Sequence, residues 1–181
     1  YGNNGTIYGP TCVDGKVGKA LYTDGTGKYI TCNKDALNIN SNNFSGIAWI
    51  KVLGDGSNNT NGIMNGKAFR FYFRNNNTNL AVQMTLNGNF YGGGEVNNVN
   101  YSRGNWVLFS FTYNGSYISF YQDGNKLGIV NAAGTLSFDR DCQMGSIQGS
   151  TYNLNGIIDE VRIYNRALSD QEIKALYDST K

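Results

Sequence analysis

The chain contains no histidine, which removes the side chain that enzymes use most often as a general base at neutral pH. The absence also excludes Ser-His and Cys-His pairs and a Tyr/His lyase centre, and it argues against zinc. Charged residues make up only 15% of the 181 residues, and the net charge is +2. Lys and Arg are dispersed along the chain, so the sequence lacks the basic patch of a nucleic-acid-binding protein.

Long apolar runs are missing as well. No stretch reaches the roughly 18 apolar residues that a membrane-spanning helix needs, and no signal peptide is visible. Because the chain begins at Tyr1 without a methionine, we expect a mature product or a fragment, with any leader removed or outside this sequence.

Proline occurs once, whereas glycine occurs 24 times and asparagine is abundant. This mixture supplies the positive φ angles of many tight turns rather than long helices. A length of 181 residues is enough for one all-β domain with a full sandwich core, so we expect a single domain over 1–181.

Three cysteines allow one disulfide in three possible pairings. We favour Cys12 with Cys32, which would close about 20 residues; the alternative is that Cys12, Cys32 and Cys142 are buried free thiols. Six Asn-x-Ser/Thr sequons point towards an exported and glycosylated protein, although an Asn-rich chain contains some by chance. They lie at Asn4, Asn43, Asn58, Asn76, Asn100 and Asn114.

Alternation of apolar and polar residues recurs along the chain. Residues 69–74 and 80–86 alternate on either side of an Asn-rich turn and predict a hairpin. Residues 106–113 and 117–122 predict a second hairpin around Asn114-Gly115, a strong two-residue turn signal. Short strands separated by Gly and Asn turns indicate two packed antiparallel sheets.

The C-terminal residues predict a strand that leads into a helix. Ile158, Val161 and Ile163 are strand formers, and Ser169 with Glu172 has capping-box spacing. This run resembles the closing motif of the laminin-G-like, concanavalin A-like jelly-roll domains. Residues 14–30 resemble the opening of that family, residues 44–51 its next buried strand, and residues 106–124 its central hairpin.

The resemblance implies a two-sheet antiparallel jelly-roll sandwich with a short C-terminal helix. Members of the family often hold a structural calcium, and the matching residues here are Asp24 and Asp159. The alternatives are a turn residue for Asp24 and an exposed or capping acid for Asp159. Family members usually begin with an apolar strand, and we expect this strand to be missing here, so that the edge left unpaired would invite another chain.

Relatives with this fold include glycanases and polysaccharide lyases, but a catalytic carboxylate pair is not evident. The Glu-x-Asp-x-x-Glu signature of the glucanase relatives does not occur, and Glu95 stands alone in an expected loop. Asp159 and Glu160 are adjacent, so they point to opposite faces of a strand. Asp139 and Asp141 have i, i+2 spacing but resemble an exposed turn. Gly-rich residues 92–94 lack the Lys-Ser/Thr of a P-loop and predict a loop tip. We therefore predict no enzyme activity.

Aromatic residues give the best candidates for a binding surface. Trp49 and Trp106 lie in apolar strands and predict core packing. Thirteen tyrosines are more than a core would normally bury, and tyrosines on polar strand faces suit stacking against sugars. Our candidate ligand-binding residues are Arg70, Tyr72, Arg74, Gln83 and Tyr91; the alternative is a solvated sheet face.

These patterns favour a non-catalytic, lectin-like carbohydrate-binding or adhesion module, secreted or on the cell surface and stabilised by Ca²⁺, with a polysaccharide or glycoconjugate as partner. The alternative is a structural subunit of a surface fibre or pilus that contacts neighbouring subunits through its N-terminal region or an exposed strand edge. A glycanase or lyase is disfavoured. If the outer strand face binds the glycan, we expect Tyr72→Ala to weaken binding with little loss of stability.

Overall fold

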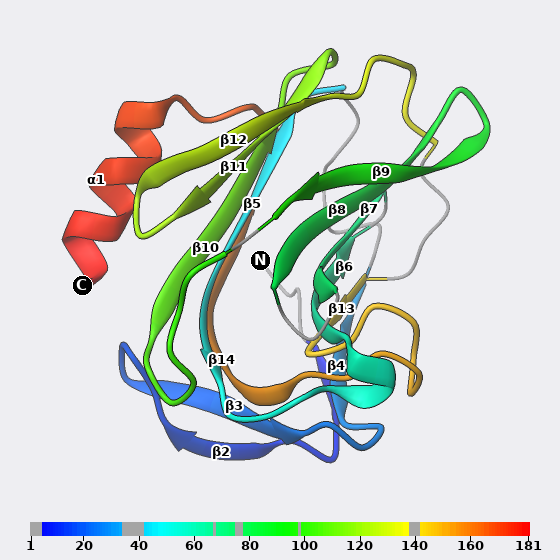
Figure 1. Cartoon of the computed structure of the whole chain (residues 1–181). Helices are drawn as coiled ribbons and strands as arrows, with labels where there is room; N and C mark the ends of the chain where they lie inside the picture. Colours follow the sequence, from blue (N-terminus) through cyan, green and yellow to red (C-terminus); the bar gives the residue numbers. More distant parts are fainter. Residues whose placement is uncertain (1–4, 34–41, 67, 75–77, 98, 138–141) are drawn as a thin grey trace.

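A computed structural model describes residues 5–33, 42–66, 68–74, 78–97, 99–137 and 142–181, although not the side chains of residues 90–93. The described chain forms two layers of antiparallel β-sheet with one helix at the C-terminal end (Figure 1). Within these residues, no helix has the length and apolar character needed to cross a membrane.

Each sheet has seven strands. Sheet 1 has the order β1 (Thr6–Tyr8), β4 (Tyr29–Cys32), β13 (Cys142–Met144), β6 (Asn61–Gly66), β7 (Phe69–Arg74), β8 (Asn79–Leu86), β9 (Asn89–Val96). Sheet 2 has the order β12 (Asn125–Asn131), β11 (Tyr117–Gln122), β10 (Val107–Tyr113), β5 (Phe44–Val52), β14 (Asn155–Tyr164), β3 (Lys19–Asp24), β2 (Thr11–Asp14). The sequence prediction of two antiparallel sheets, built with a hairpin from β7 and β8 and another from β10 and β11, is confirmed.

The main core lies between the sheets and is rich in aromatic rings. The alternation in β7 directs Phe69, Phe71 and Phe73 inward, and all three are fully buried. Phe71 lies 5.0 Å from Phe111 of β10, and Phe73 makes an edge contact at 4.9 Å with Phe109, measured between ring centroids. Such edge contacts add specific geometry to the hydrophobic burial that holds the two sheets together.

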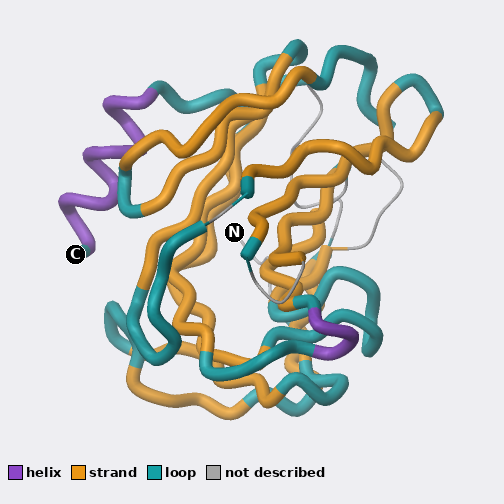
Figure 2. The backbone as a smooth tube through the Cα atoms, viewed as in Figure 1, coloured by secondary structure: helices purple, strands orange, loops and turns teal. Residues whose placement is uncertain are grey.

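Helix α1 (Asp170–Thr180) covers the outer face of sheet 2. It begins at the predicted capping box, in which the Ser169 side chain accepts the amide of Glu172 and the Glu172 carboxylate accepts the amide of Ser169. Ile173 is fully buried against this face, and the Trp49 Nε1 atom donates to the Thr180 hydroxyl at 2.9 Å. Trp49 is therefore a packing residue, as predicted. Figure 2 shows α1 and the short 3₁₀ turn η2 (Ser57–Asn59) at opposite sides of the molecule.

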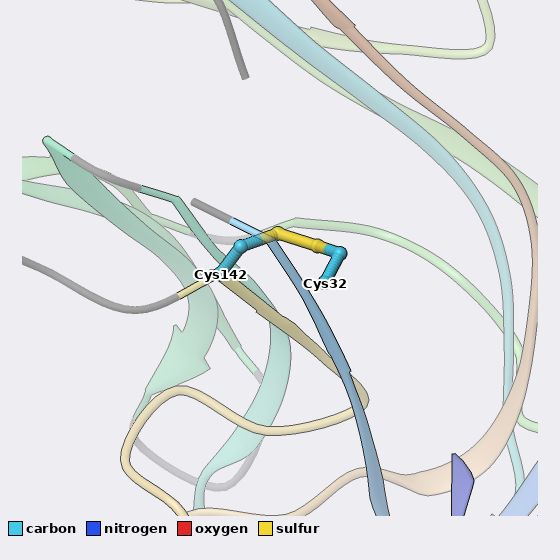
Figure 3. Close-up of a disulfide and its surroundings, with 2 residues drawn as sticks. All are labelled: Cys32 and Cys142. Atoms are coloured by element: carbon cyan, nitrogen blue, oxygen red, sulfur yellow. A yellow bond between two sulfur atoms is a disulfide. The ribbon is translucent and has the colours of Figure 1, made fainter. Parts of the chain in front are cut away.

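The disulfide joins Cys32 to Cys142, so the predicted Cys12–Cys32 pairing is wrong (Figure 3). Cys32 and Cys142 are 110 residues apart in sequence but lie opposite each other in β4 and β13, with 5.2 Å between their Cα atoms. Cys12 is free and exposed on β2. The sequence prediction favoured the pairing of Cys12 with Cys32 because these residues are close in sequence. Sequence spacing does not reveal that the distant strands β4 and β13 are neighbours.

The predicted loop tip at residues 92–94 is also wrong, because these glycines lie within β9. Gly94 is opposite Val82 of β8, and a Cβ atom on Gly94 would lie 2.6 Å from the Cδ1 atom of Ile118 in sheet 2. Glycine therefore lets β9 approach the opposite sheet closely. Glu95, expected alone in a loop, lies in the same strand.

Candidate ligand-binding hollow

A hollow of about 630 Å³ lies on the outer face of sheet 1. Its floor comes from β7 and β8, and its walls come from two loops. The described residues that line it are Arg70, Tyr72, Arg74 and Gln83 on the floor, and Asn58, Asn59, Thr60, Ile147, Gln148 and Tyr152 on the walls.

The floor follows from the strand pattern. Because the phenylalanines of β7 face the core, Arg70, Tyr72 and Arg74 face outward. Gln83 lies opposite Arg70 in the register of β7 and β8, so it faces the same way. The structure thus brings together four of the five residues predicted from the sequence. The side chain of Tyr91 lies outside the described part of the structure.

One wall is the segment between β13 and β14, which lies directly on β6. This close approach requires Gly62, because a Cβ atom there would lie 2.8 Å from the amide nitrogen of Ile147. The segment is held by backbone bonding between Ile147 and Tyr152, at 3.3 Å. The Gln143 side chain also accepts the amide of Gly149 at 2.9 Å. The wall is therefore attached to the sheet rather than suspended above it.

The other wall is η2 and the residue after it. Asn58 and Asn59 both have a φ of 54°, a left-handed conformation that asparagine tolerates better than most residues. The Asn58 side-chain amide donates to the Thr151 carbonyl at 3.1 Å, and the Ser57 hydroxyl donates to the same carbonyl at 2.7 Å. The two walls are thus bonded to each other.

Tyr72 is far more buried than the sequence suggested, with only 5% of the residue exposed. It packs with Ala81 and Ile147 and against the half-buried Tyr152. Desolvation raises the pKa of Tyr72 to about 12, so its hydroxyl stays protonated at neutral pH. The expectation that Tyr72→Ala would spare stability is therefore wrong, because the loop of Ile147 and Tyr152 covers this ring. Tyr152 presents the more accessible aromatic surface.

The charged side chains that line the described part of the hollow are all positive. Its described lining has two guanidinium groups and no carboxylate. Beside it, Glu95 accepts from Arg74 at 3.2 Å and from the side-chain amide of Asn79 at 3.3 Å. Glu95 therefore forms an ion pair at the edge of the site, and the described lining residues include no pair of facing carboxylates suited to glycoside hydrolysis.

The two acids predicted to share calcium lie apart. Asp24 is opposite Asn155, four residues before Asp159, which corresponds to roughly 13 Å along the strand. Lys28 and Thr26 hold the pKa of Asp24 down to about 2, and the Lys28 ammonium lies 2.7 Å from the carboxylate. Asp159 accepts the amides of Val17 at 2.9 Å and Glu160 at 2.7 Å.

This arrangement does not fit one ion shared by Asp24 and Asp159. No cluster of three or more Asp, Glu, Cys or His side chains suited to a metal occurs in the described parts of the chain. Calcium binding stays an untested prediction. The acids at 139 and 141, which the sequence analysis considered for catalysis, lie outside the described residues.

The wall residues were missed by sequence reasoning. Ile147, Gln148 and Tyr152 are more than 60 residues from the floor in sequence, and no periodicity connects them to β7. Two weak signals were available. One was a glycine within the strand β6, which often marks close backbone approach, and the other was a tyrosine within a polar segment rich in turns.

Comparisons with known proteins agree with this architecture. The structure is similar to domain 4 of AbnA, a GH43 extracellular arabinanase from Geobacillus stearothermophilus solved with arabinotriose, with a TM-score of 0.72 and 18% identity over 96% of this chain and 87% of that one. It is also similar to the binding domain of Paraclostridial Mosquitocidal Protein 1, with a TM-score of 0.74 and 17% identity over 98% of this chain and 47% of that one.

A third similar structure is the binding domain of botulinum neurotoxin DC in complex with rat synaptotagmin II, with a TM-score of 0.69 and 17% identity. The match covers 99% of this chain and 48% of that one, so the chain spans about half the length of the toxin binding domains. At these identities the likeness shows the fold alone. A sequence comparison with curated proteins found no match. A family model does match residues 24–174, and the chain therefore belongs to the concanavalin A-like lectin/glucanase superfamily, in its laminin-G-like branch.

Proposed function

We propose that this protein is a non-catalytic carbohydrate-binding module of an exported protein, and that the hollow on sheet 1 is its ligand site. The observation that carries the proposal is the convergence of Arg70, Gln83 and two tyrosines, from separate elements, around an open space of about 630 Å³. Sugars offer hydroxyl groups for hydrogen bonds and apolar ring faces for aromatic contact, and this lining supplies partners for both.

Fold relatives support a binding role without fixing the ligand. Domain 4 of the arabinanase was solved with arabinotriose, and the toxin structures are binding domains. A non-catalytic role is supported by the absence of histidine from the whole sequence and by the ion pair that engages Glu95. A retaining glycosidase would need two carboxyl groups about 5 to 5.5 Å apart in the site.

Affinity electrophoresis against neutral and acidic plant and bacterial polysaccharides tests the proposal. Tyr152→Ala should abolish retardation of the protein by any polysaccharide that retards the parent. Tyr117→Ala is the matched control, since Tyr117 is 40% exposed on sheet 2, away from the hollow. Reducing-end and unsaturated-product assays should stay at background. Binding that survives Tyr152→Ala but is lost in Tyr117→Ala would contradict this location of the site.

We propose a surface-assembly subunit as the second candidate, and β1 is the observation that favours it. In the described part of the chain, β1 is one of the two edge strands of sheet 1, and Ile7 and Tyr8 on it are 55% and 49% exposed. Apolar edge strands pair readily with other chains. Concentration-dependent association in sedimentation experiments, removed by Ile7→Lys, would favour this function; a monomer at all concentrations would reject it.

A further inference from the structure

We infer that the hollow selects anionic glycans, those with carboxylate or sulfate groups, over neutral ones. This inference rests on the proposed function and adds the chemical class of the ligand. It follows from the kinds of hydrogen-bonding group that the lining contains, from their spacing along β7, and from the charges around them.

The charged lining groups are donors. A guanidinium carries five N–H donors and no acceptor, whereas a carboxylate or sulfate has only acceptors. Arg70 and Arg74 both line the hollow, and none of its described lining residues is acidic. A neutral sugar hydroxyl both donates and accepts, so a site for neutral sugars gains from acidic acceptors, which this described lining does not contain.

The spacing of the two arginines suits an extended chain. Arg70 and Arg74 are four residues apart on one strand, which places their Cα atoms roughly 13 Å apart. Separate acidic groups of one oligosaccharide can therefore reach different guanidinium groups. Tyr72 lies between the arginines, and a phenol is uncharged at neutral pH, so it adds no negative charge to the floor.

Glu95 limits the positive charge at one end. Its carboxylate pairs with Arg74 at 3.2 Å, and it also accepts from Asn79. Ionic groups at a partly exposed site contribute modestly to stability, so a change here alters mainly the local charge. Removing the charge of Glu95 should strengthen the attraction for an anion, whereas removing the charge of Arg70 should weaken it. Opposite responses to these two substitutions distinguish ionic selection from simple disruption.

The experiment compares glycans that share one backbone and differ in whether their carboxylates are free or esterified. Polygalacturonate is compared with its methyl ester, and alginate with its propylene glycol ester, by titration calorimetry with the whole chain. The acidic forms should bind about ten-fold or more tightly than their esters, the effect of losing one charge-assisted hydrogen bond. Their affinity should fall as sodium chloride is raised from about 0.01 M to about 1 M, where the Debye length falls from about 30 Å to about 3 Å.

Three variants complete the test. Arg70→Gln should lower affinity for the acidic glycans about ten-fold or more, while Glu95→Gln should raise it. Lys19→Gln, which removes one positive charge from an exposed site on β3, should leave it unchanged. Circular dichroism confirms the fold of each variant. If Arg70→Gln does not fold, the ester comparison and Glu95→Gln still decide the question.

The outcomes separate the two proposals. Equal binding of an acidic glycan and its ester, or weaker binding by Glu95→Gln, would overturn anionic selection. Binding of neutral arabinan alone, abolished by Tyr152→Ala, would overturn it while supporting the hollow as a glycan site. Failure of all the acidic and neutral polysaccharides to bind would reject both the ligand class and the proposed function.

Discussion

In both sheets, alternate residues of a strand face outward, but the two outer faces differ in what covers them. On sheet 2, Ile47 and Trp49 face outward and are buried beneath Ile173 of α1. On sheet 1, Arg70 and Tyr72 face outward, and a loop covers only part of the face. The outer face of sheet 2 therefore forms a second small hydrophobic core with α1, whereas the outer face of sheet 1 carries the hollow.

The different cover of the two outer faces implies that the face of sheet 2 contributes to stability and the face of sheet 1 to binding. An apolar face has to be covered, and a helix with an apolar stripe covers it continuously. A mixed face of guanidinium, phenol and amide groups does not require such cover, because its polar atoms can be satisfied by water or by a ligand. Substitutions on sheet 2 should therefore affect folding alone, whereas selected substitutions on sheet 1 should also affect binding.

The largest difference in stability is expected between substitutions at Phe71 and Tyr72, two adjacent residues of β7 whose side chains face opposite sides of the sheet. Phe71→Ala should cost about 3–5 kcal/mol of unfolding free energy, because it leaves a cavity between the sheets. Tyr72→Phe, which keeps the ring and removes only the hydroxyl, should change stability by about 1 kcal/mol or less. Urea unfolding measures both variants. Similar losses for the two would show that β7 does not have one core face and one site face.

The disulfide joins β4 to β13 in sheet 1, and sheet 2 has no equivalent within the described residues. Replacing Cys32 and Cys142 with serine should cost about 2–5 kcal/mol, because the bond closes 110 residues. Cys12→Ser is the matched control and should lie within about 0.5 kcal/mol of the parent. Urea unfolding with and without reductant measures the effect. A double variant as stable as the oxidised parent would contradict the pairing.

Ile173→Ala tests the packing of α1 against the outer face of sheet 2, because it removes most of a side chain that is buried there. We expect a loss of about 2 kcal/mol, at the low end for a buried Ile because a helix at the surface can partly close the gap. Glycan affinity should be unchanged, since α1 and the hollow lie on opposite outer faces. Thermal unfolding and calorimetric titration of the same preparation provide both readings. A substantial loss of affinity would show that the two faces are coupled.

A smaller effect is expected at the start of α1. Ser169→Ala removes the side chain that accepts the amide of Glu172 and should cost about 1 kcal/mol. Ser169→Gly should recover most of this loss, because glycine is tolerated at an N-cap. Thermal midpoints rank the three proteins. A Gly variant less stable than the Ala variant would show that the capping bond is not the cause.

The smallest effect is the pH dependence of the same cap. Arg166 and the amide of Ser169 hold the pKa of Glu172 at about 2, below its ordinary value of 4.5. A depressed pKa means that the stabilisation is fully present above about pH 4.5 and is lost as the pH falls towards about 2. Glu172→Gln should therefore be less stable than the parent at pH 7 and should approach it near pH 2. A stability difference independent of pH would reject this role for the carboxylate.

Much of the architecture could be predicted because it depends on neighbours in sequence. Alternation in residues 69–74 predicted both the buried phenylalanines and the outward set that forms the floor of the hollow. The turn at Asn114-Gly115 and the cap at Ser169 were readable for the same reason. The loop that buries Tyr72 was not readable, because its position depends on a glycine in β6 and on a segment more than 70 residues later.

By itself, the sequence determined the strands of the two hairpins, which face of β7 packs in the core, and where the helix begins, since these depend on side chains a few positions apart. Only the tertiary structure decided that Cys142 lies opposite Cys32, that Asp24 and Asp159 are four register positions apart, and that Tyr152 stands over β7. The order and register of strands distant in sequence set these neighbours. That order depends on how the two whole sheets pack against each other, and a pattern of neighbouring residues contains no information about it.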